Sequence, residues 1–212
     1  MYPDYSVPER IADGIMHAIG VIGAITGAII LMVWAGGLTS PGQMAGVAIY
    51  GATLIATFVA SAMYHMTPWE AARPILRRFD HAAIYLKIAG TYTPLVVMIG
   101  SAFAYTILGV VWGLAVIGMV LKLFFWRTPG QFGPALYLIM GWLSVALIWS
   151  LWPIVPRAAM ILMGAGGLLY TTGVIFYAAE KMRFSNAIWH GFVVAASACF
   201  FAAIALGTGH IA

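Results

Sequence analysis

Seven long runs of apolar residues, separated by short polar breaks, restrict the fold of this chain more than any other feature. A helix needs about 20 apolar residues to cross a membrane. The chain is 63% hydrophobic and only 8% charged, whereas a soluble domain carries about 25% charge. We therefore predict an all-α integral membrane protein, a single seven-helix transmembrane domain over residues 1–212. The expected spans are residues 15–37, 43–65, 81–99, 104–125, 134–152, 158–178 and 187–207.

The breaks between the runs contain the residues that usually end membrane helices. Ser40-Pro41-Gly42 separates the first two spans, and a charged stretch over residues 66–79 separates the next two. The third break, around Gly100-Ser101, is only about four residues long. The third and fourth spans are therefore expected to form a tight hairpin. Cys199 is the only cysteine, so no disulfide can form within the chain.

The distribution of Lys and Arg predicts the orientation of the chain. Short cytoplasmic loops are enriched in these residues. The side of the N-terminus carries eight of them and the opposite side only Arg157, while Lys87 lies inside the third span. The N-terminus is thus expected in the cytoplasm. We expect a multi-pass protein of the cell inner (plasma) membrane, whose partners are membrane lipids and not nucleic acid. The eight are Arg10, Arg73, Arg77, Arg78, Lys122, Arg127, Lys181 and Arg183.

Ionisable residues gather on one side of the predicted bundle. His17, His65, Asp80, His81 and His190 each lie near an end of an apolar run, and the number of crossings places all five ends on one side. Because such groups are costly at the edge of hydrocarbon, they indicate a functional site by default. Histidines around a carboxylate predict a metal site, and zinc is the metal that such ligands favour.

Two further polar residues lie one helical turn from these histidines. Ser61 precedes His65 by four residues in SAMYH, and Asn186 precedes His190 by four in NAIWH. Residues four apart share one face of a helix. The sequence therefore predicts that Ser61 and Asn186 face the same site as the two histidines.

Each polar residue also has a simpler interpretation. Asp80 alone could be a helix N-cap. His17, together with Glu9 and Asp13, could be an outer partner of the site or the polar start of the first helix, and we favour the second interpretation. His81 follows Asp80 directly and points about 100° away around the helix, outside the site of Asp80. Lys87 is expected to snorkel back to the cytoplasmic surface, with an ion pair to Asp80 as the alternative.

Several motifs resemble the haemolysin III family, the bacterial branch of the adiponectin and progestin receptor superfamily. They are ERIADGIMHAIG, SAMYH, FDHAAIYLKIAGTYTP, YLIMGWLSV and NAIWHGFVV, and they cover nearly the whole chain in order. The resemblance implies a seven-helix bundle with zinc in the cytoplasmic leaflet. It implies His65 and His190 as ligands, Asp80 as the residue that holds the activated water, and Ser61 in the wall of the site.

The chain departs from the family pattern in the seventh span. The family motif has two histidines four residues apart, and the first is here Asn186; a further family histidine is here Phe200. An amide oxygen is a poor zinc ligand. Either His65, His190 and Asp80 hold zinc with Asn186 as a hydrogen-bond partner, or the site is weak or empty.

Two functions therefore stay open at this point. The first is a zinc-dependent hydrolase of a lipid amide, with Asp80 as general base, since superfamily receptors are linked to ceramide hydrolysis. The second is a non-enzymatic haemolytic, pore-forming or membrane-homeostasis protein. The middle of the spans is almost entirely apolar, so a pore would need several copies, for which the sequence offers no argument.

Overall fold

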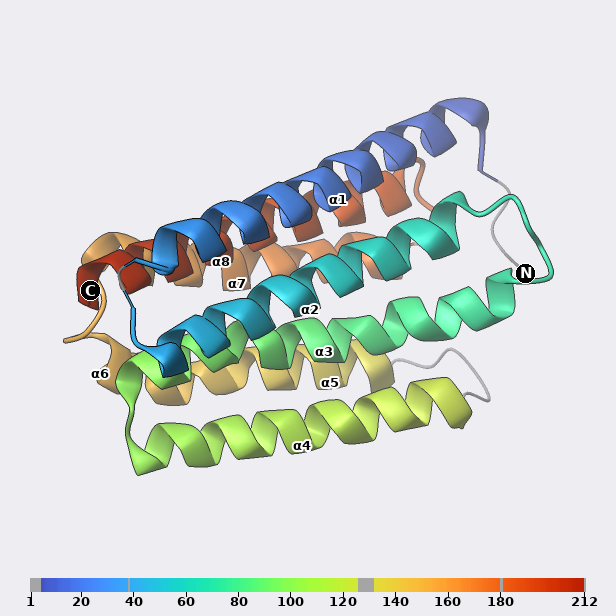
Figure 1. The fold of residues 1–212 in the computed structure, drawn as a ribbon. Helices are drawn as coiled ribbons and strands as arrows, with labels where there is room; N and C mark the ends of the chain where they lie inside the picture. Colours follow the sequence, from blue (N-terminus) through green and yellow to red (C-terminus); the bar gives the residue numbers. More distant parts are fainter. Residues whose placement is uncertain (1–4, 38, 126–131, 180, 212) are drawn as a thin grey trace.

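The computed structural model describes residues 5–37, 39–125, 132–179 and 181–211. This part of the chain is helical, without a β-strand. Its helices lie side by side and alternate in direction, so that α1 begins and α8 ends at opposite ends of the bundle (Figure 1). The long helices are α1 (Val7–Ala35), α2 (Pro41–Met66), α3 (Arg73–Ile99), α4 (Ala102–Phe124), α7 (Arg157–Ala178) and α8 (Ser185–Ile211).

These six helices are each long and apolar enough to cross a membrane. The predicted fifth span is also helical, but it is shorter than these six helices and it is interrupted. It consists of α5 (Phe132–Trp142), the 3₁₀ turn η1 (Leu143–Leu147) and α6 (Ile148–Leu151). At the interruption the Tyr92 hydroxyl of α3 donates to the carbonyl oxygens of Met140 (2.7 Å) and Gly141 (3.0 Å). A 3₁₀ turn changes which backbone carbonyls are bonded inside the helix, and Tyr92 satisfies two of them.

The predicted hairpin between the third and fourth spans is confirmed. Helix α3 ends at Ile99, and Gly100 follows with φ +67°, a left-handed conformation that glycine adopts without strain. The Ser101 side chain then accepts a hydrogen bond from the backbone N–H of Ala104 at 3.2 Å and begins α4. Two residues therefore reverse the chain.

Helix α1 begins at Val7, two turns before the predicted start at residue 15, so that boundary was wrong. Ser6 and Glu9 form a capping box, in which the Ser6 backbone N–H donates to the Glu9 carboxylate at 3.0 Å. The other Glu9 oxygen accepts from the backbone N–H of Phe184 at 2.9 Å, just before α8. The charged first turns are therefore helical, and Asp13 and His17 lie within a helix held against α8.

Helix α3 is the central helix of the bundle. Of its most apolar window 61% is buried, compared with 17% for α4 and for α7. It packs against α2 closely enough that a Cβ atom on Gly90 would overlap the Thr53 hydroxyl oxygen. Side chains on the inner face of α3 are consequently enclosed by α2 and α8.

Lys87 is one of these enclosed side chains, and the predicted snorkelling to the surface is wrong. The side chain is buried, with the residue 7% exposed, and its amine donates to the Ser197 hydroxyl of α8 at 2.6 Å. The amine also lies 4.8 Å from the ring centroid of Phe58 and 5.0 Å from that of Tyr170. Because aromatic faces attract a cation, the inward direction is favourable for this lysine.

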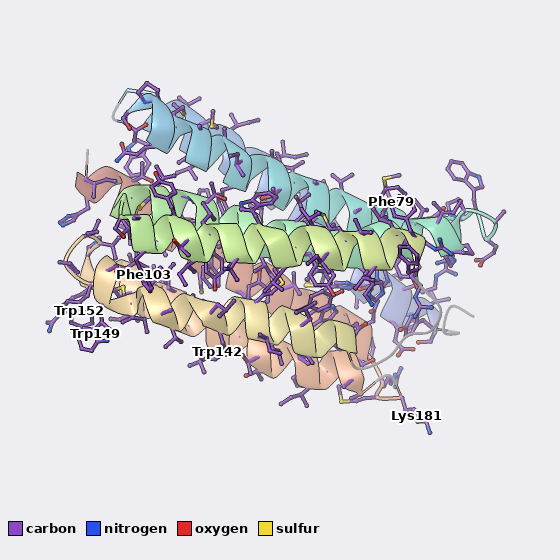
Figure 2. All side chains as sticks on the ribbon, turned by 90° about the horizontal axis from the view of Figure 1, so that it is seen from below. Phe79, Phe103, Trp142, Trp149, Trp152 and Lys181 are labelled. Carbon is purple, nitrogen blue, oxygen red and sulfur yellow. The ribbon has the colours of Figure 1, made fainter. Side chains whose placement is uncertain are left out.

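The outside of the bundle is apolar, as a lipid surrounding requires. Trp149 is 86% exposed, and it lies with Trp152 and Phe103 at one end of the bundle, while Phe79 and Lys181 lie toward the other (Figure 2). Exposed aromatic residues near both ends are typical of membrane interfaces.

Candidate metal centre

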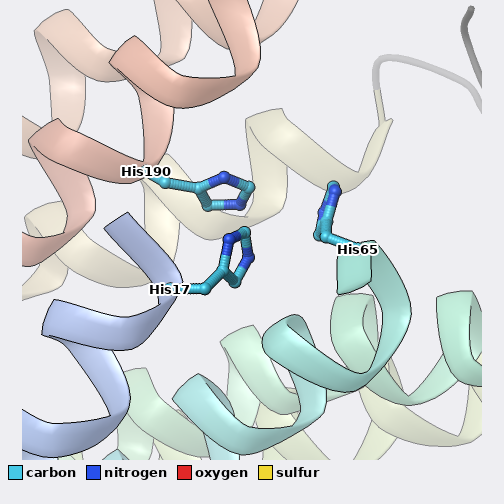
Figure 3. A group of neighbouring side chains, drawn as sticks. All are labelled: His17, His65 and His190. Carbon is cyan, nitrogen blue, oxygen red and sulfur yellow. The ribbon is translucent and has the colours of Figure 1, made fainter. Parts of the chain in front are cut away.

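Three histidine rings from three helices meet inside one end of the bundle. His17 comes from α1, His65 from α2 and His190 from α8, and their rings face one another (Figure 3). The ring centroids of His17 and His190 are 4.2 Å apart, those of His65 and His190 4.6 Å, and those of His17 and His65 5.1 Å. One nitrogen from each ring lies within 4.8 Å of the other two. Nitrogens bound to one zinc ion stand about 3–4 Å apart, so the group could hold a metal ion if the rings moved slightly closer together.

Each of the three helices brings a second polar residue one turn before its histidine. Residues at i and i+4 lie on the same face of a helix, so these partners face the same space as the rings. The three pairs are Asp13 and His17 on α1, Ser61 and His65 on α2, and Asn186 and His190 on α8.

Asp13 is buried and contacts the histidines from one side. Its Oδ1 accepts from His190 Nδ1 at 2.6 Å, and its backbone oxygen accepts from His17 Nδ1 at 2.8 Å. Its Oδ2 lies 3.8 Å from His65 Nδ1. A single residue of α1 thus meets a ring nitrogen of all three histidines.

Asn186 lies between the same groups. Its side-chain amide donates to Asp13 Oδ2 at 2.9 Å, and the amide nitrogen lies 3.2 Å from His65 Nδ1. The position at which the resemblance implied a histidine therefore holds a hydrogen-bonding amide in this chain.

Asp80 and Ser61 lie near the other ring nitrogens of His65 and His17, not the Nδ1 atoms that Asp13 approaches. Asp80 Oδ2 is 3.8 Å from His65 Nε2, and the Ser61 hydroxyl is 3.3 Å from His17 Nε2. Both line one cavity with the three histidines. The structure therefore brings together all five residues that the sequence singled out for the site: Ser61, His65, Asp80, Asn186 and His190.

Sequence reasoning missed Asp13 and His17. The favoured interpretation of His17 as merely the polar start of the first span was wrong, and the alternative that it belongs to the site with Asp13 was nearer, because its ring lies in the histidine group. The error follows from placing the start of the first helix at residue 15, which leaves Asp13 outside it. The capping pattern of Ser6 and Glu9 was the available signal, since it extends the helix and puts Asp13 and His17 on one face.

His81 stays outside the histidine group, although it lines the same cavity. Its ring centroid lies 6.5 Å from that of Tyr177, and its backbone oxygen accepts from the Tyr137 hydroxyl at 3.0 Å.

The cavity is lined by both polar and apolar residues. Its volume of about 120 Å³ is smaller than the 300–1,000 Å³ typical of a pocket for a drug-sized ligand, so a whole lipid does not fit inside it. The polar residues include the three histidines, Asp80 and Arg77. The apolar residues include Phe58, Ile84, Val193 and Val194, which lie one to two turns from His65, Asp80 and His190 along α2, α3 and α8, toward the middle of the bundle.

Comparison with known proteins identifies the family. The family model described as "Haemolysin-III related" matches residues 5–201. The chain belongs to the haemolysin III family. This confirms the resemblance predicted from the sequence motifs, and the chain is accordingly a multi-pass protein of the cell membrane.

Three relatives show the range of this family. The chain is 35% identical to "Hemolysin-3 homolog" of Bacillus subtilis (strain 168) over 198 residues, covering 93% of each protein. It is 36% identical to "Hemolysin-3" of Bacillus cereus over 196 residues, covering 92% of this chain and 90% of the relative. It is 28% identical to human "Monocyte to macrophage differentiation factor" over 165 residues, covering 74% of this chain and 67% of the relative.

Proposed function

We propose that this haemolysin III protein is a zinc-dependent membrane hydrolase that cleaves an amide bond of a lipid. The observation that supports this most is the meeting of three imidazoles, one carboxylate and one hydroxyl in a single cavity. Catalytic zinc sites commonly have three protein ligands and one open position. His17, His65 and His190 fit this pattern, and they supply the third histidine that α8 lacks at Asn186.

The residues around the histidines suit hydrolysis. When bound, zinc lowers the pKa of water toward 7 and polarises a carbonyl group. Asp80, 3.8 Å from His65 Nε2, is placed to accept a proton from the attacking water and to pass it to the leaving amine. Ser61 faces the same space and can donate a hydrogen bond to the substrate carbonyl oxygen. The products are a carboxylic acid and an amine, so water is the only co-substrate.

The shape of the cavity favours a lipid amide as substrate. The amide group would lie beside the histidines and Asp80, and the acyl chain would extend along the apolar residues Phe58, Ile84 and Val193. The rest of the chain would lie outside this small cavity, among the surrounding lipids.

We further propose seven crossings with the N-terminus in the cytoplasm. The interrupted segment α5–η1–α6 would be the fifth crossing, and the eight basic residues on the side of the N-terminus against one on the other give the orientation. The histidine group would then lie in the cytoplasmic leaflet.

Zinc content and hydrolysis can be measured together on the detergent-purified protein. We expect about one zinc per chain and release of fatty acid from a fluorescent N-acyl sphingoid base. Asp80→Asn should keep zinc and lose hydrolysis, and His17→Ala should lose both. Glu70→Gln, in an exposed loop, is the matched control and should behave like the wild type. Hydrolysis that persists in Asp80→Asn, or a wild type without zinc, would contradict the proposal.

Lysis of cells is the second candidate, because the two Bacillus relatives carry the name hemolysin. Haemoglobin release from erythrocytes should be compared between the wild type, Asp80→Asn and His17→Ala. Equal lysis by all three would favour a non-enzymatic role, whereas loss of lysis in both variants would make any lysis a consequence of hydrolysis.

A further inference from the structure

The coordinating nitrogens of two histidines follow from their hydrogen bonds to Asp13. An ionised carboxylate and a backbone carbonyl can only accept hydrogen bonds. Since His190 Nδ1 lies 2.6 Å from Asp13 Oδ1 and His17 Nδ1 lies 2.8 Å from the Asp13 backbone oxygen, both Nδ1 atoms carry the proton. The lone pair of each neutral ring is then on Nε2, which is the nitrogen left for a metal.

Asp13 is itself held by a residue of another helix. The Asn186 amide donates to Asp13 Oδ2 at 2.9 Å, while Oδ1 is used by His190. Both carboxylate oxygens therefore contact α8, although Asp13 belongs to α1. Two hydrogen bonds from α8, one to each oxygen, therefore restrict the rotation of the Asp13 carboxylate.

We propose that Asp13 is a positioning residue that selects the tautomer and ring direction of His190, and that Asn186 holds Asp13 in place for this task. The inference rests on the proposed zinc site and deepens it. In this proposal Asn186 is not a metal ligand. It supports the carboxylate that prepares a ligand, while His17 supplies the third imidazole from α1.

The other polar groups near His190 do not provide this contact. Asp80 lies near His65 Nε2 at 3.8 Å, and Ser61 lies near His17 Nε2 at 3.3 Å. Among the described residues, the His190 ring forms its hydrogen bond with Asp13. Partners of this kind raise ligand basicity, and their loss commonly weakens metal affinity or activity by about 10–100-fold.

Zinc affinity measured by competition with a chromophoric chelator tests the proposal. Asp13→Asn keeps the shape of the side chain but offers either an oxygen or an NH₂ group to His190, so it should weaken zinc binding about 10–100-fold. Asn186→Leu, a change on the other helix, should weaken it about tenfold. Glu70→Gln serves again as the control. Wild-type affinity in both site variants would overturn the proposal.

A second readout needs no metal. In the zinc-free protein with ¹⁵N-labelled histidine, NMR should show His190 protonated on Nδ1 in the wild type and a mixture of tautomers in Asp13→Asn and Asn186→Leu. A helix that merely packs less well would not change a tautomer. The same Nδ1–H form in all three proteins would also overturn the proposal. If the wild type binds no zinc, the proposed function fails, while the NMR result still decides the role of Asp13.

Discussion

Replacing Ser197 by alanine should destabilise the protein more than removing the lysine that it contacts. Three groups meet at the Ser197 hydroxyl: the Lys87 amine at 2.6 Å, the Tyr170 hydroxyl at 3.0 Å and the Val193 carbonyl oxygen at 2.6 Å. The serine has one proton, which it gives to Val193, so the other two groups donate to its oxygen. One small side chain thus satisfies two buried donors.

The expected free energies follow from this count. A buried donor that loses its partner costs about 1–3 kcal/mol, so Ser197→Ala, which removes the partner of two donors, should cost about 2–6 kcal/mol. Lys87→Met removes the donor and keeps an apolar chain of similar length, so it should cost about 1.5 kcal/mol or less. In the double variant only Tyr170 stays without its partner, and Ser197→Ala should therefore cost about 1–3 kcal/mol less than it does alone.

Steric trapping in lipid bicelles measures the free energy of unfolding of the wild type, the two single variants and the double variant. Apolar side chains that fill the space of Lys87 should be tolerated, and Lys87→Leu is a second check on that. If Lys87→Met is the costlier single change, or if the two changes are additive within about 0.5 kcal/mol, the hydroxyl does not satisfy the amine as described here.

Three further outcomes are expected. With cysteine introduced at Glu70 or His210, an impermeant thiol reagent should label position 210 in intact cells and position 70 only after permeabilisation; labelling of both in intact cells would contradict the orientation. Tyr92→Phe should lower the free energy of unfolding by about 1 kcal/mol, because the Met140 carbonyl oxygen near the end of α5 loses its side-chain donor, whereas the Gly141 carbonyl oxygen keeps that of Ser144; an unchanged value would show that the backbone satisfies Met140 otherwise. Gly20→Ala should cost about 1–3 kcal/mol, since its Cβ would overlap the ring of Phe58, whereas Gly23→Ala, with nothing within 4 Å, should be neutral; equal effects would contradict this packing.

The sequence was sufficient for the features that depend on local composition. Apolar runs located the six long helices, and Gly100 located the hairpin turn. The spacing of four residues between Asn186 and His190 correctly placed both on one face of α8, next to His65. Each of these inferences uses only neighbouring residues and the period of a helix.

The features that were missed depend on distant partners. Lys87 points inward because Ser197 and two aromatic rings from other helices receive it, and no neighbouring residue in the sequence reports this. The interruption of the fifth apolar run is stabilised by Tyr92, which belongs to α3. Hydropathy measures how apolar a segment is, not which carbonyl oxygens another helix can satisfy.

The distance along the chain between Asp13 and His190, 177 residues, has a consequence for biosynthesis. Helix α1 leaves the ribosome first and α8 last, so Asp13 and His17 must enter the membrane long before Asn186 and His190 exist. Until then the first span carries a carboxylate and an imidazole without these partners, which is costly in hydrocarbon. A metal could thus be bound by all three histidines only after the last helix has been inserted. A chain that stops before α8 would present a first helix whose polar residues lack their partners, which membrane quality control could recognise.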